Sequence, residues 1–299
     1  NCGRYCWAKV DFVDIDPITW NISVEALENK LIVAEREQRL PKVVVVVHLC
    51  GLPCDMEVIS RLAKQYGFSV IEDACHAIGG RYQGKPIGSG QYSEITVFSF
   101  HPVKNMTTAE GGMAVTNNAE FAEQMRLLRN HGITRDSEKM QKSGGPWCYQ
   151  QVELGFNYRL SDLHAALGIS QLSRIDQFVE KRHQLARIYD EALRELPIQR
   201  PIYLEASYSG LHLYVIRVNF SQAKLTRNEL YRKMREAGVG VNVHYIPVHT
   251  QPYYQQLGFN QGDFPQAERY YEEALTLPMF PDMSVSEQQK VIDTLRSLL

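Results

Sequence analysis

Lys104 stands out as a candidate for chemistry because of the residues around it. It follows an apolar, strand-like stretch at 96–99 and Pro102, and it precedes segment 107–112, which is poor in helix-forming residues. Most lysines are solvated surface residues. A loop of this kind, however, can hold an amine at the mouth of a sheet. A partly desolvated amine loses basicity and becomes a nucleophile toward carbonyl groups.

Asp73 is a second candidate, at the end of the preceding strand-like stretch. Its carboxylate can serve as a helix cap or a solvated turn residue, or it can hold a proton on a heteroaromatic nitrogen. A lysine for a Schiff base and an aspartate for a pyridinium nitrogen are the two protein groups that pyridoxal 5'-phosphate (PLP) requires. Taken alone, the pair is a weak signal for that cofactor.

Both residues are positioned by apolar strands that alternate with helices. The predicted strands cover residues 43–47, 68–71, 96–99 and 113–116, and the predicted helices cover 55–66 and about 118–129. This alternation predicts an α/β fold with a mostly parallel sheet covered on both faces. Ligands bind outside the carboxyl ends of such strands, which directs attention to His48 and to segments 72–76 and 99–104.

A smaller α+β unit is predicted beyond Pro201, after a long helix at 161–193 and a polar loop at 136–146. Its elements are an alternating strand at 211–220, a helix at 226–238, a strand at 239–243, and helices near 265–275 and 286–298. A further strand is expected at 10–13. We therefore predict a large cofactor-binding domain at 1–175 and, at 176–299, a linking helix with a small C-terminal domain.

Composition excludes several classes of protein. The net charge is −2 over 299 residues and no basic block occurs, so we expect no nucleic-acid partner. The longest apolar run, 43–47, is far shorter than the ~20 residues of a membrane helix. The spacing of Cys2/Cys6 and Cys50/Cys54 favours small buried thiols in a reducing cytosol over a zinc site or a disulfide scaffold. We expect a cytoplasmic protein with no metal.

Three other common cofactor and catalytic motifs are missing from the chain. It contains no G-x-G-x-x-G after a strand, no G-x-x-x-x-G-K-[ST] and no G-x-S-x-G. A dinucleotide site, a P-loop and a nucleophile elbow therefore lack their sequence motifs.

Four ordered segments resemble the nucleotide-sugar aminotransferases of the DegT/DnrJ/EryC1/StrS family. They are residues 72–77 (EDACHA), 98–104 (FSFHPVK), 107–112 (TTAEGG) and 155–162 (GFNYRLSD). The resemblance extends from 13–17 to 277–281, close to the full chain. It implies a fold-type I PLP-dependent aminotransferase, with a mostly parallel large domain and a smaller α+β C-terminal domain. The sequences around Lys104, at 146–147 and at 241–245 are most similar to the 4-aminotransferases of pseudaminic acid biosynthesis.

The resemblance implies a role at each matching position. Lys104 would bind PLP as a Schiff base and move a proton between the cofactor's C4′ and the sugar's C4, while Asp73 would pair with the pyridine nitrogen. His76 would lie beside the ring and its 3-oxygen, and Ser99 would bind the phosphate. Asn157 would reach the phosphate of a neighbouring subunit, which implies a homodimer with a shared active site.

Four further residues would contact the nucleotide sugar by resemblance: Arg159, His244, Tyr245 and His249. A structural salt bridge explains Arg159 equally well, and core or rim positions explain the other three. The family's N-terminal phosphate turn and stacking aromatic residue have no counterpart in this chain. We therefore expect the natural polypeptide to begin upstream of Asn1.

The implied reaction is a ping-pong transamination. L-Glutamate would donate the amine to C4 of a UDP-linked 4-keto-6-deoxy-N-acetylhexosamine, in the biosynthesis of pseudaminic acid, a nonulosonic acid. The alternatives are a 4-aminotransferase of the perosamine, bacillosamine or 4-amino-arabinose pathway, or a truncated, cofactor-free relative. A sugar dehydratase of the same fold would carry a histidine in place of the lysine, so Lys104 argues against it.

Overall fold

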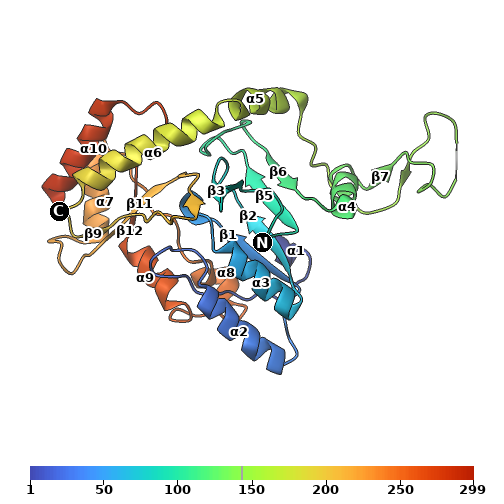
Figure 1. Ribbon diagram of the computed structural model, residues 1–299, viewed down its shortest axis with the longest axis horizontal. Helices are drawn as coiled ribbons and strands as arrows, with labels where there is room; N and C mark the ends of the chain where they lie inside the picture. The colour runs from blue at the N-terminus through green and yellow to red at the C-terminus, as the bar shows by residue number, and fades with distance from the viewer. Residues whose placement is uncertain (143) are drawn as a thin grey trace.

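A four-stranded sheet positions the loops that hold the candidate residues. The computed structural model describes residues 1–142 and 144–299, and its first sheet has the order β1-β2-β5-β6. The strands are β1 (Val43–Val47), β2 (Ser69–Asp73), β5 (Ile95–Ser99) and β6 (Gly112–Val115). The first three are parallel and β6 is antiparallel to β5 (Figure 1). The predicted mostly parallel sheet is confirmed, and the carboxyl ends of three strands meet at one edge.

Helix α3 (Met56–Tyr66) shows how local sequence produces this fold. The Asp55 carboxylate accepts a hydrogen bond from the N–H of Val58 and so caps the first turn. Gly67 ends the helix in the left-handed region, at φ 74°. Ile59 and Leu62 are buried against the sheet, and burying each such side chain stabilises the fold by about 1.5–3 kcal/mol. The predicted helix at 55–66 is confirmed.

One face of the first sheet differs from its prediction. Helices α2 (Val24–Arg36) and α3 pack in a core that includes Val46, which points toward them. Val43, Val45 and Val47 point the other way and remain 43–50% exposed. Within residues 1–142 and 144–299, that part of the sheet is therefore covered on one side only. The cause is the period of two in a strand, which sends alternate valines to opposite faces.

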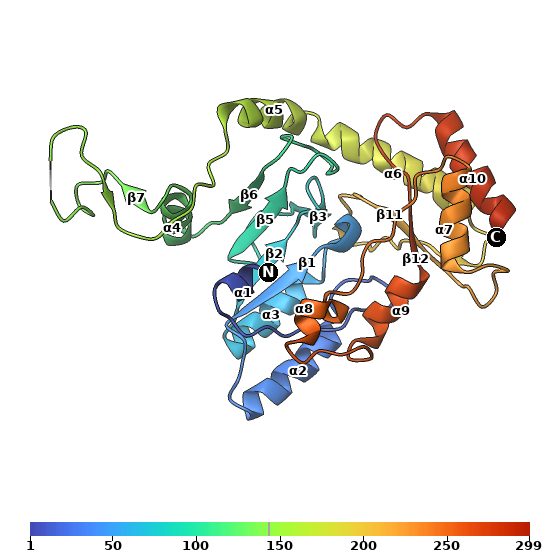
Figure 2. The ribbon, with the colours of Figure 1, turned by 180° about the vertical axis from the view of Figure 1, so that it is seen from behind.

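The second unit is built on an antiparallel sheet of order β12-β11-β9. Its strands are β9 (Ile198–Gln199), β11 (Tyr214–Val218) and β12 (Ala274–Leu277), and its helices are α7 (Arg227–Glu236), α9 (Pro265–Glu273) and α10 (Val285–Leu298). Helices α7 and α10 lie side by side near the C-terminus (Figure 2). All five side chains of β11 are buried, so the predicted alternation at 211–220 is wrong: this strand lies between two packed layers.

Two other predicted strands, at 239–243 and 10–13, are wrong. Residues 239–243 contribute the bridge Asn242–Thr276, and the stretch at 10–13 is followed by the bridge Ile15–Ile22. Backbone pairing with β12 stops after Asn242, and no ladder extends from it. An apolar run predicts burial here without predicting strand pairing.

The predicted helix at 161–193 is two helices, α5 (Asp162–Leu172) and α6 (Ile175–Ala192). Helix α6 joins two cores: Ile175 and Val179 pack with Phe100, whereas Leu185 and Tyr189 belong to the core of the second unit. The domain boundary at 175/176 stays a prediction, because α6 contributes to both sides of it.

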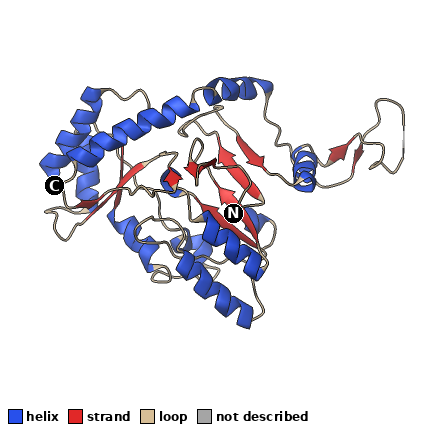
Figure 3. Ribbon diagram, viewed as in Figure 1, coloured by secondary structure: helices blue, strands red, loops and turns tan. Residues whose placement is uncertain are grey.

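Short elements complete the chain, with helices around the periphery in Figure 3. They are α1 (Cys2–Tyr5), β3 (Arg81–Tyr82), β4 (Lys85–Pro86), α4 (Ala119–Arg129), β7 (Ile133–Thr134), β8 (Gln150–Gln151), β10 (Ser207–Tyr208), α8 (Pro252–Gln255), and two 3₁₀ turns at Leu49–Gly51 and Val248–Thr250. The excursion that carries β7 and β8 extends away from the rest of the molecule (Figure 1).

Among the described residues, no helix has both the length and the apolar character of a membrane span. Cys50 and Cys54 are buried thiols, as predicted, whereas Cys2 and Cys6 are exposed.

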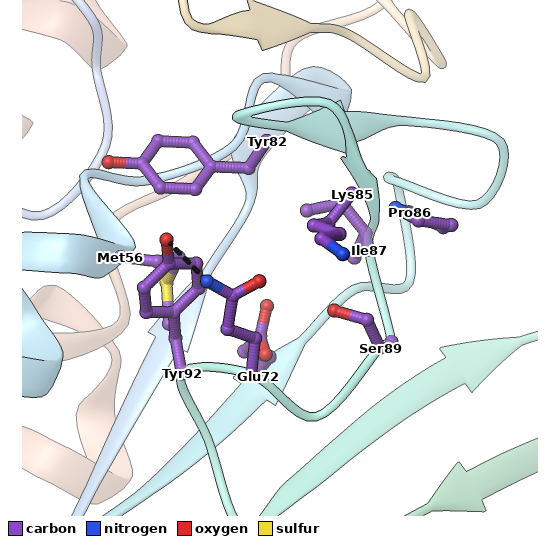
Figure 4. Close-up of a pocket in the computed structure, with 10 residues that line it drawn as sticks. Met56, Glu72, Tyr82, Lys85, Pro86, Ile87, Ser89 and Tyr92 are labelled. Carbon is purple, nitrogen blue, oxygen red and sulfur yellow. Dashed lines mark hydrogen bonds between the residues drawn. The ribbon is translucent and has the colours of Figure 1, made fainter.

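A buried hydrogen-bonded pair, His48 and Glu72, ties β1, β2 and β5 together beneath the carboxyl edge of the sheet. His48 Nδ1 accepts the N–H of Cys54 at 3.1 Å, so Nε2 carries the ring proton and donates it to Glu72 at 2.8 Å. Ser93 and Thr96 donate to the other oxygen of Glu72. A cavity of about 10 Å³ lies beside Glu72 and is lined also by Tyr82, Tyr92, Ile87 and Ser89 (Figure 4), with room for at most one water.

These contacts make Glu72 a source of pH-dependent stability. Burial alone would raise the pKa of the Glu72 carboxyl, but its three hydrogen bonds outweigh that effect and hold the pKa below its usual value. A lowered folded-state pKa stabilises the protein above the unfolded pKa of about 4.3, and this contribution is lost as the pH falls through the folded value.

Glu72→Gln should therefore destabilise the protein by about 1–3 kcal/mol at neutral pH, because buried partners lose an ionised acceptor. The difference from the natural sequence should shrink as the pH falls below about 4, since the natural carboxylate is protonated as the pH passes its lowered folded-state pKa. Urea unfolding followed by circular dichroism at several pH values measures both effects. Glu28→Gln, on the exposed side of α2, is the matched control. A constant difference at all pH values would contradict the prediction.

Candidate active site

The loop after β5 holds Lys104 half-buried. Its backbone N–H donates to His101 at 3.0 Å in a turn, and the carbonyl of Phe100 accepts hydrogen bonds from Thr107 and Thr108 further along the loop. Burial lowers the pKa of the Lys104 amine, although the neighbouring Cys75 and Asp73 oppose that shift. A larger fraction of this amine is therefore uncharged than in a solvated lysine.

Asp73 ends β2 and faces the same loop. The strand register places it between Val47 of β1 and Val97 of β5. One carboxylate oxygen accepts the N–H of Cys75 at 3.1 Å. The charge of Asp73 opposes the loss of the Lys104 proton. The structure thus brings together the amine and the carboxylate that the sequence pairs.

His76 is buried beside them, with its tautomer set by hydrogen bonds. Its Nδ1 accepts the N–H of Cys50 at 3.3 Å, so Nε2 carries the proton and faces the hydroxyl of Tyr245 at 3.3 Å. Burial, and after it the Lys104 ammonium, lowers the pKa of His76 to about 3. The ring is therefore neutral at physiological pH.

Two predicted residues of the second unit reach this group. Tyr245 lies with its ring at 25° to that of His76, the centroids 6.1 Å apart. The hydroxyl of Tyr245 accepts from His76, which leaves its own hydrogen free to donate. His244 is anchored by a 2.8 Å hydrogen bond to Thr276 of β12. Burial, and then Lys104, lowers the pKa of His244, so it too is neutral.

The remaining predicted cofactor residue, Ser99, is half-buried at the end of β5. Its hydroxyl accepts the N–H of His101 at 3.4 Å, and its hydrogen is free to donate. Together, Lys104, Asp73, His76 and Ser99 provide an amine, a carboxylate, a neutral ring and a hydroxyl at one sheet edge. This set matches the aldehyde, ring nitrogen, ring and phosphate of PLP, so the residues fit that cofactor.

Three predicted residues lie elsewhere in the described chain. Asn157 is exposed and forms a bridge with Asn130, whose side chain accepts a hydrogen bond from Arg159 at 2.8 Å. This contact occurs after β8, on the excursion visible in Figure 1. His249 is buried, pairs with Glu268 at 2.8 Å and packs against Phe264. Its partners are not those of Lys104, and the substrate role of His249 stays a prediction.

Two residues of the site are missing from the sequence-based prediction. Asn105 follows Lys104 directly, and His212 contacts it from 107 positions away. Asn105 could have been predicted from the sequence, because it lies next to Lys104. The sequence holds no comparable signal for His212, because a separation of that length carries no pattern.

Comparison with known proteins agrees with this geometry. The model of the DegT/DnrJ/EryC1/StrS aminotransferase family matches residues 1–296. Over 294 residues the chain is 38% identical to MJ1066 of Methanocaldococcus jannaschii, covering 98% of this chain and 74% of that protein. It is also 38% identical to the spore coat polysaccharide biosynthesis protein SpsC of Bacillus subtilis, covering 96% and 73%.

Solved structures show the same fold. Helicobacter pylori PseC, described as an aminotransferase involved in the biosynthesis of pseudoaminic acid, superposes with a TM-score of 0.87 at 30% identity, covering 99% of this chain and 75% of that one. The PLP form of Spr1654 from Streptococcus pneumoniae gives 0.85 at 28% identity, covering 99% and 76%. The architecture is thus that of a fold-type I aminotransferase, and the chain belongs to the PLP-dependent DegT/DnrJ/EryC1/StrS aminotransferase family.

Proposed function

We propose that this chain transfers an amino group from L-glutamate to C4 of a UDP-linked 4-keto-6-deoxy-N-acetylhexosamine, using PLP, in pseudaminic acid biosynthesis. The observation that carries the proposal is the half-buried Lys104 amine beside Asp73, at the carboxyl edge of β2 and β5. An amine with a lowered pKa in that position is suited to reversible attack on a carbonyl carbon.

Bound PLP would supply an aldehyde for the amine and a ring that withdraws electrons. Lys104 would hold the aldehyde and then, released as a free amine, carry a proton to and from the reacting carbon. Asp73 would keep a proton on the ring nitrogen. Ser99 would donate its hydroxyl hydrogen to the phosphate, and the neutral His76 would lie beside the ring without adding positive charge.

The choice of acceptor sugar is supported by similarity to PseC and by the resemblance at 241–245. The 4-keto sugars of the perosamine, bacillosamine and 4-amino-arabinose pathways are the competing acceptors. Because such selectivity depends on a few contacts in the pocket, the assay must compare all four.

Absorbance spectroscopy tests the cofactor and the amino donor. PLP added to the purified chain should give the visible band of lysine-bound cofactor, and L-glutamate should shift that band to the shorter wavelength of the amine form. Lys104→Ala should show neither the bound band nor the shift, because it removes the only group that we assign to the aldehyde. Lys85→Ala, on β4, is the control.

Turnover with the four UDP-, GDP- or dTDP-linked 4-keto sugars then tests the acceptor, with product amine measured by mass spectrometry. If the chain binds PLP and reacts with glutamate but aminates another sugar, only the assignment of the acceptor sugar is overturned. A folded chain with no lysine-dependent band would overturn the enzyme proposal and favour the cofactor-free relative.

A homodimer with a shared site belongs to the same proposal. Leu154, Phe156 and Tyr158 flank Asn157 and are 52–87% exposed, and helix α5 exposes Leu163 and Ile169. Apolar surface of this extent is typical of a contact with another protein. A second copy covering it would bring Asn157 toward the neighbouring Lys104.

Mixing two inactive variants tests the shared site. Lys104→Ala and Asn157→Ala should each be inactive or strongly impaired. After denaturation and refolding together, the mixture should recover up to about a quarter of natural activity, because half of the pairs are mixed and each has one intact site. Activity no higher than the sum of the separate variants would show that the two residues do not act across subunits.

Tyr245 offers a third test. Tyr245→Phe keeps the ring beside His76 but removes the hydroxyl that donates to a ligand. We expect a ~5–15-fold rise in the KM for the sugar, the cost of one hydrogen bond to a neutral acceptor, with the absorbance of bound PLP unchanged. Tyr253→Phe, an exposed tyrosine of α8, is the control. An unchanged KM would remove Tyr245 from the sugar site.

A further inference from the structure

A segment of the second unit, residues 209–213, passes directly behind the loop that holds Lys104; we call it the strap. Its backbone is bonded to the loop after β1, with Gly210 N–H donating to Gly51 at 2.9 Å and His212 N–H donating to Cys50 at 2.8 Å. On its other side, the guanidinium of Arg182 in α6 donates to the carbonyls of Leu211 and His212. The strap is therefore held from both sides.

The strap and the loop after β1 approach as closely as the backbone allows. Gly51 has φ +100°, and a Cβ there would come within 2.5 Å of the N atom of Leu211 and 2.7 Å of the carbonyl oxygen of His76. Only glycine tolerates this position without displacing its neighbours. The strap thus has little freedom to move relative to His76.

Asn105 connects the strap to the lysine loop. Its amide Nδ2 donates to the carbonyl of Gly210 at 2.5 Å, which fixes the orientation of the side chain because a carbonyl only accepts. Its Oδ1 then faces Nδ1 of His212 at 3.3 Å, so the proton of the His212 ring must lie on Nδ1. Both side chains are at least nine-tenths buried.

His212 makes this contact as an uncharged ring. Its centroid lies 4.6 Å from that of His76. Burial lowers the pKa of His212, and the nearby cations of Lys104 and Arg182 lower it further, while His76 and His244, which also face it, are uncharged. A neutral donor can therefore hold Asn105 without repelling the Lys104 ammonium.

We propose that Asn105 and His212 are positioning residues that clamp the backbone of Lys104 to the strap and so fix where its amine lies relative to Asp73. This inference rests on the proposed function of Lys104. The clamp grips the residue directly after the lysine, so its loss would let the amine move toward solvent. A displacement of about 1 Å at such a group can cost up to ~100-fold in rate.

Two variants at position 212 separate the effect of the hydrogen bond from the effect of the side-chain volume. His212→Asn places an amide donor where Nδ1 lies, whereas His212→Leu has similar volume but no donor. Asn105→Ala removes the clamp from the other side and keeps the test open if His212→Leu does not fold. Folding of each variant is verified by circular dichroism and thermal unfolding.

The main measurement uses the chain without PLP. Competitive acetylation over a pH series, read by peptide mass spectrometry, gives the pKa and reactivity of Lys104 alone. In His212→Leu and Asn105→Ala the pKa of Lys104 should rise toward that of the other lysines, since the amine becomes more hydrated. His212→Asn should keep the pKa of the natural chain.

Kinetics of the PLP-loaded enzyme give the second readout. His212→Leu and Asn105→Ala should lower kcat by about 10–100-fold with little change in KM, and the double variant should lose no more than the worse single variant, because both remove one clamp. His212→Asn should restore kcat to within about threefold of the natural value, as a retained donor would.

The proposal is overturned if the pKa of Lys104 is the same in the folded Leu or Ala variants as in the natural chain, or if His212→Asn and His212→Leu behave alike. Failure of the proposed function is distinguishable from this outcome: the natural chain would then bind no PLP through Lys104, while the acetylation series would still report whether the clamp sets the pKa of that amine.

Discussion

The parallel pairing of β1, β2 and β5 is the constraint on which the site depends. Parallel strands direct their carboxyl ends to one edge, and the register Val47–Asp73–Val97 sets that edge to within a residue. A one-residue slip would turn Asp73 to the opposite face. The buried His48–Glu72 pair spans the same strands directly beneath, so slipping would also leave a carboxylate without its donors, which is costly in a buried setting.

The electrostatics of the edge depend on the uncharged state of the imidazole rings around Lys104. Three imidazoles lie near the Lys104 amine, and three cations there would repel it. Cys50 N–H fixes the neutral form of His76. Burial keeps His212 neutral, and Asn105 places its ring proton on Nδ1. The rings therefore fill the volume around the amine without adding charge. Burial of the amine, opposed by Asp73, sets how readily it gives up its proton.

The parts of this arrangement that the sequence predicts are local ones. Asp55 and Gly67 mark the ends of α3 because capping chemistry acts within one turn, and Lys104 and Asp73 stand at strand ends that apolar runs reveal. His212 lies 107 residues from Asn105, and only the packed fold brings them together. The same limit explains β11: its burial on both faces depends on α6, α7 and α10 on one side and on Trp20 and Tyr270 of α9 on the other, and nothing within the strand shows it.

The two units contribute different properties to the site. The first unit, with the strap behind it, fixes the amine, the carboxylate and the neutral rings. The second unit adds the Tyr245 hydroxyl through residues that are anchored on β12 by His244 and Thr276. Because the hydroxyl of Tyr245 is bonded to His76 and not to Lys104, a substitution at this tyrosine can change what the site binds without disturbing the amine. A substitution in the strap would do the reverse, since it would alter the amine while leaving the ligand-facing hydroxyl in place.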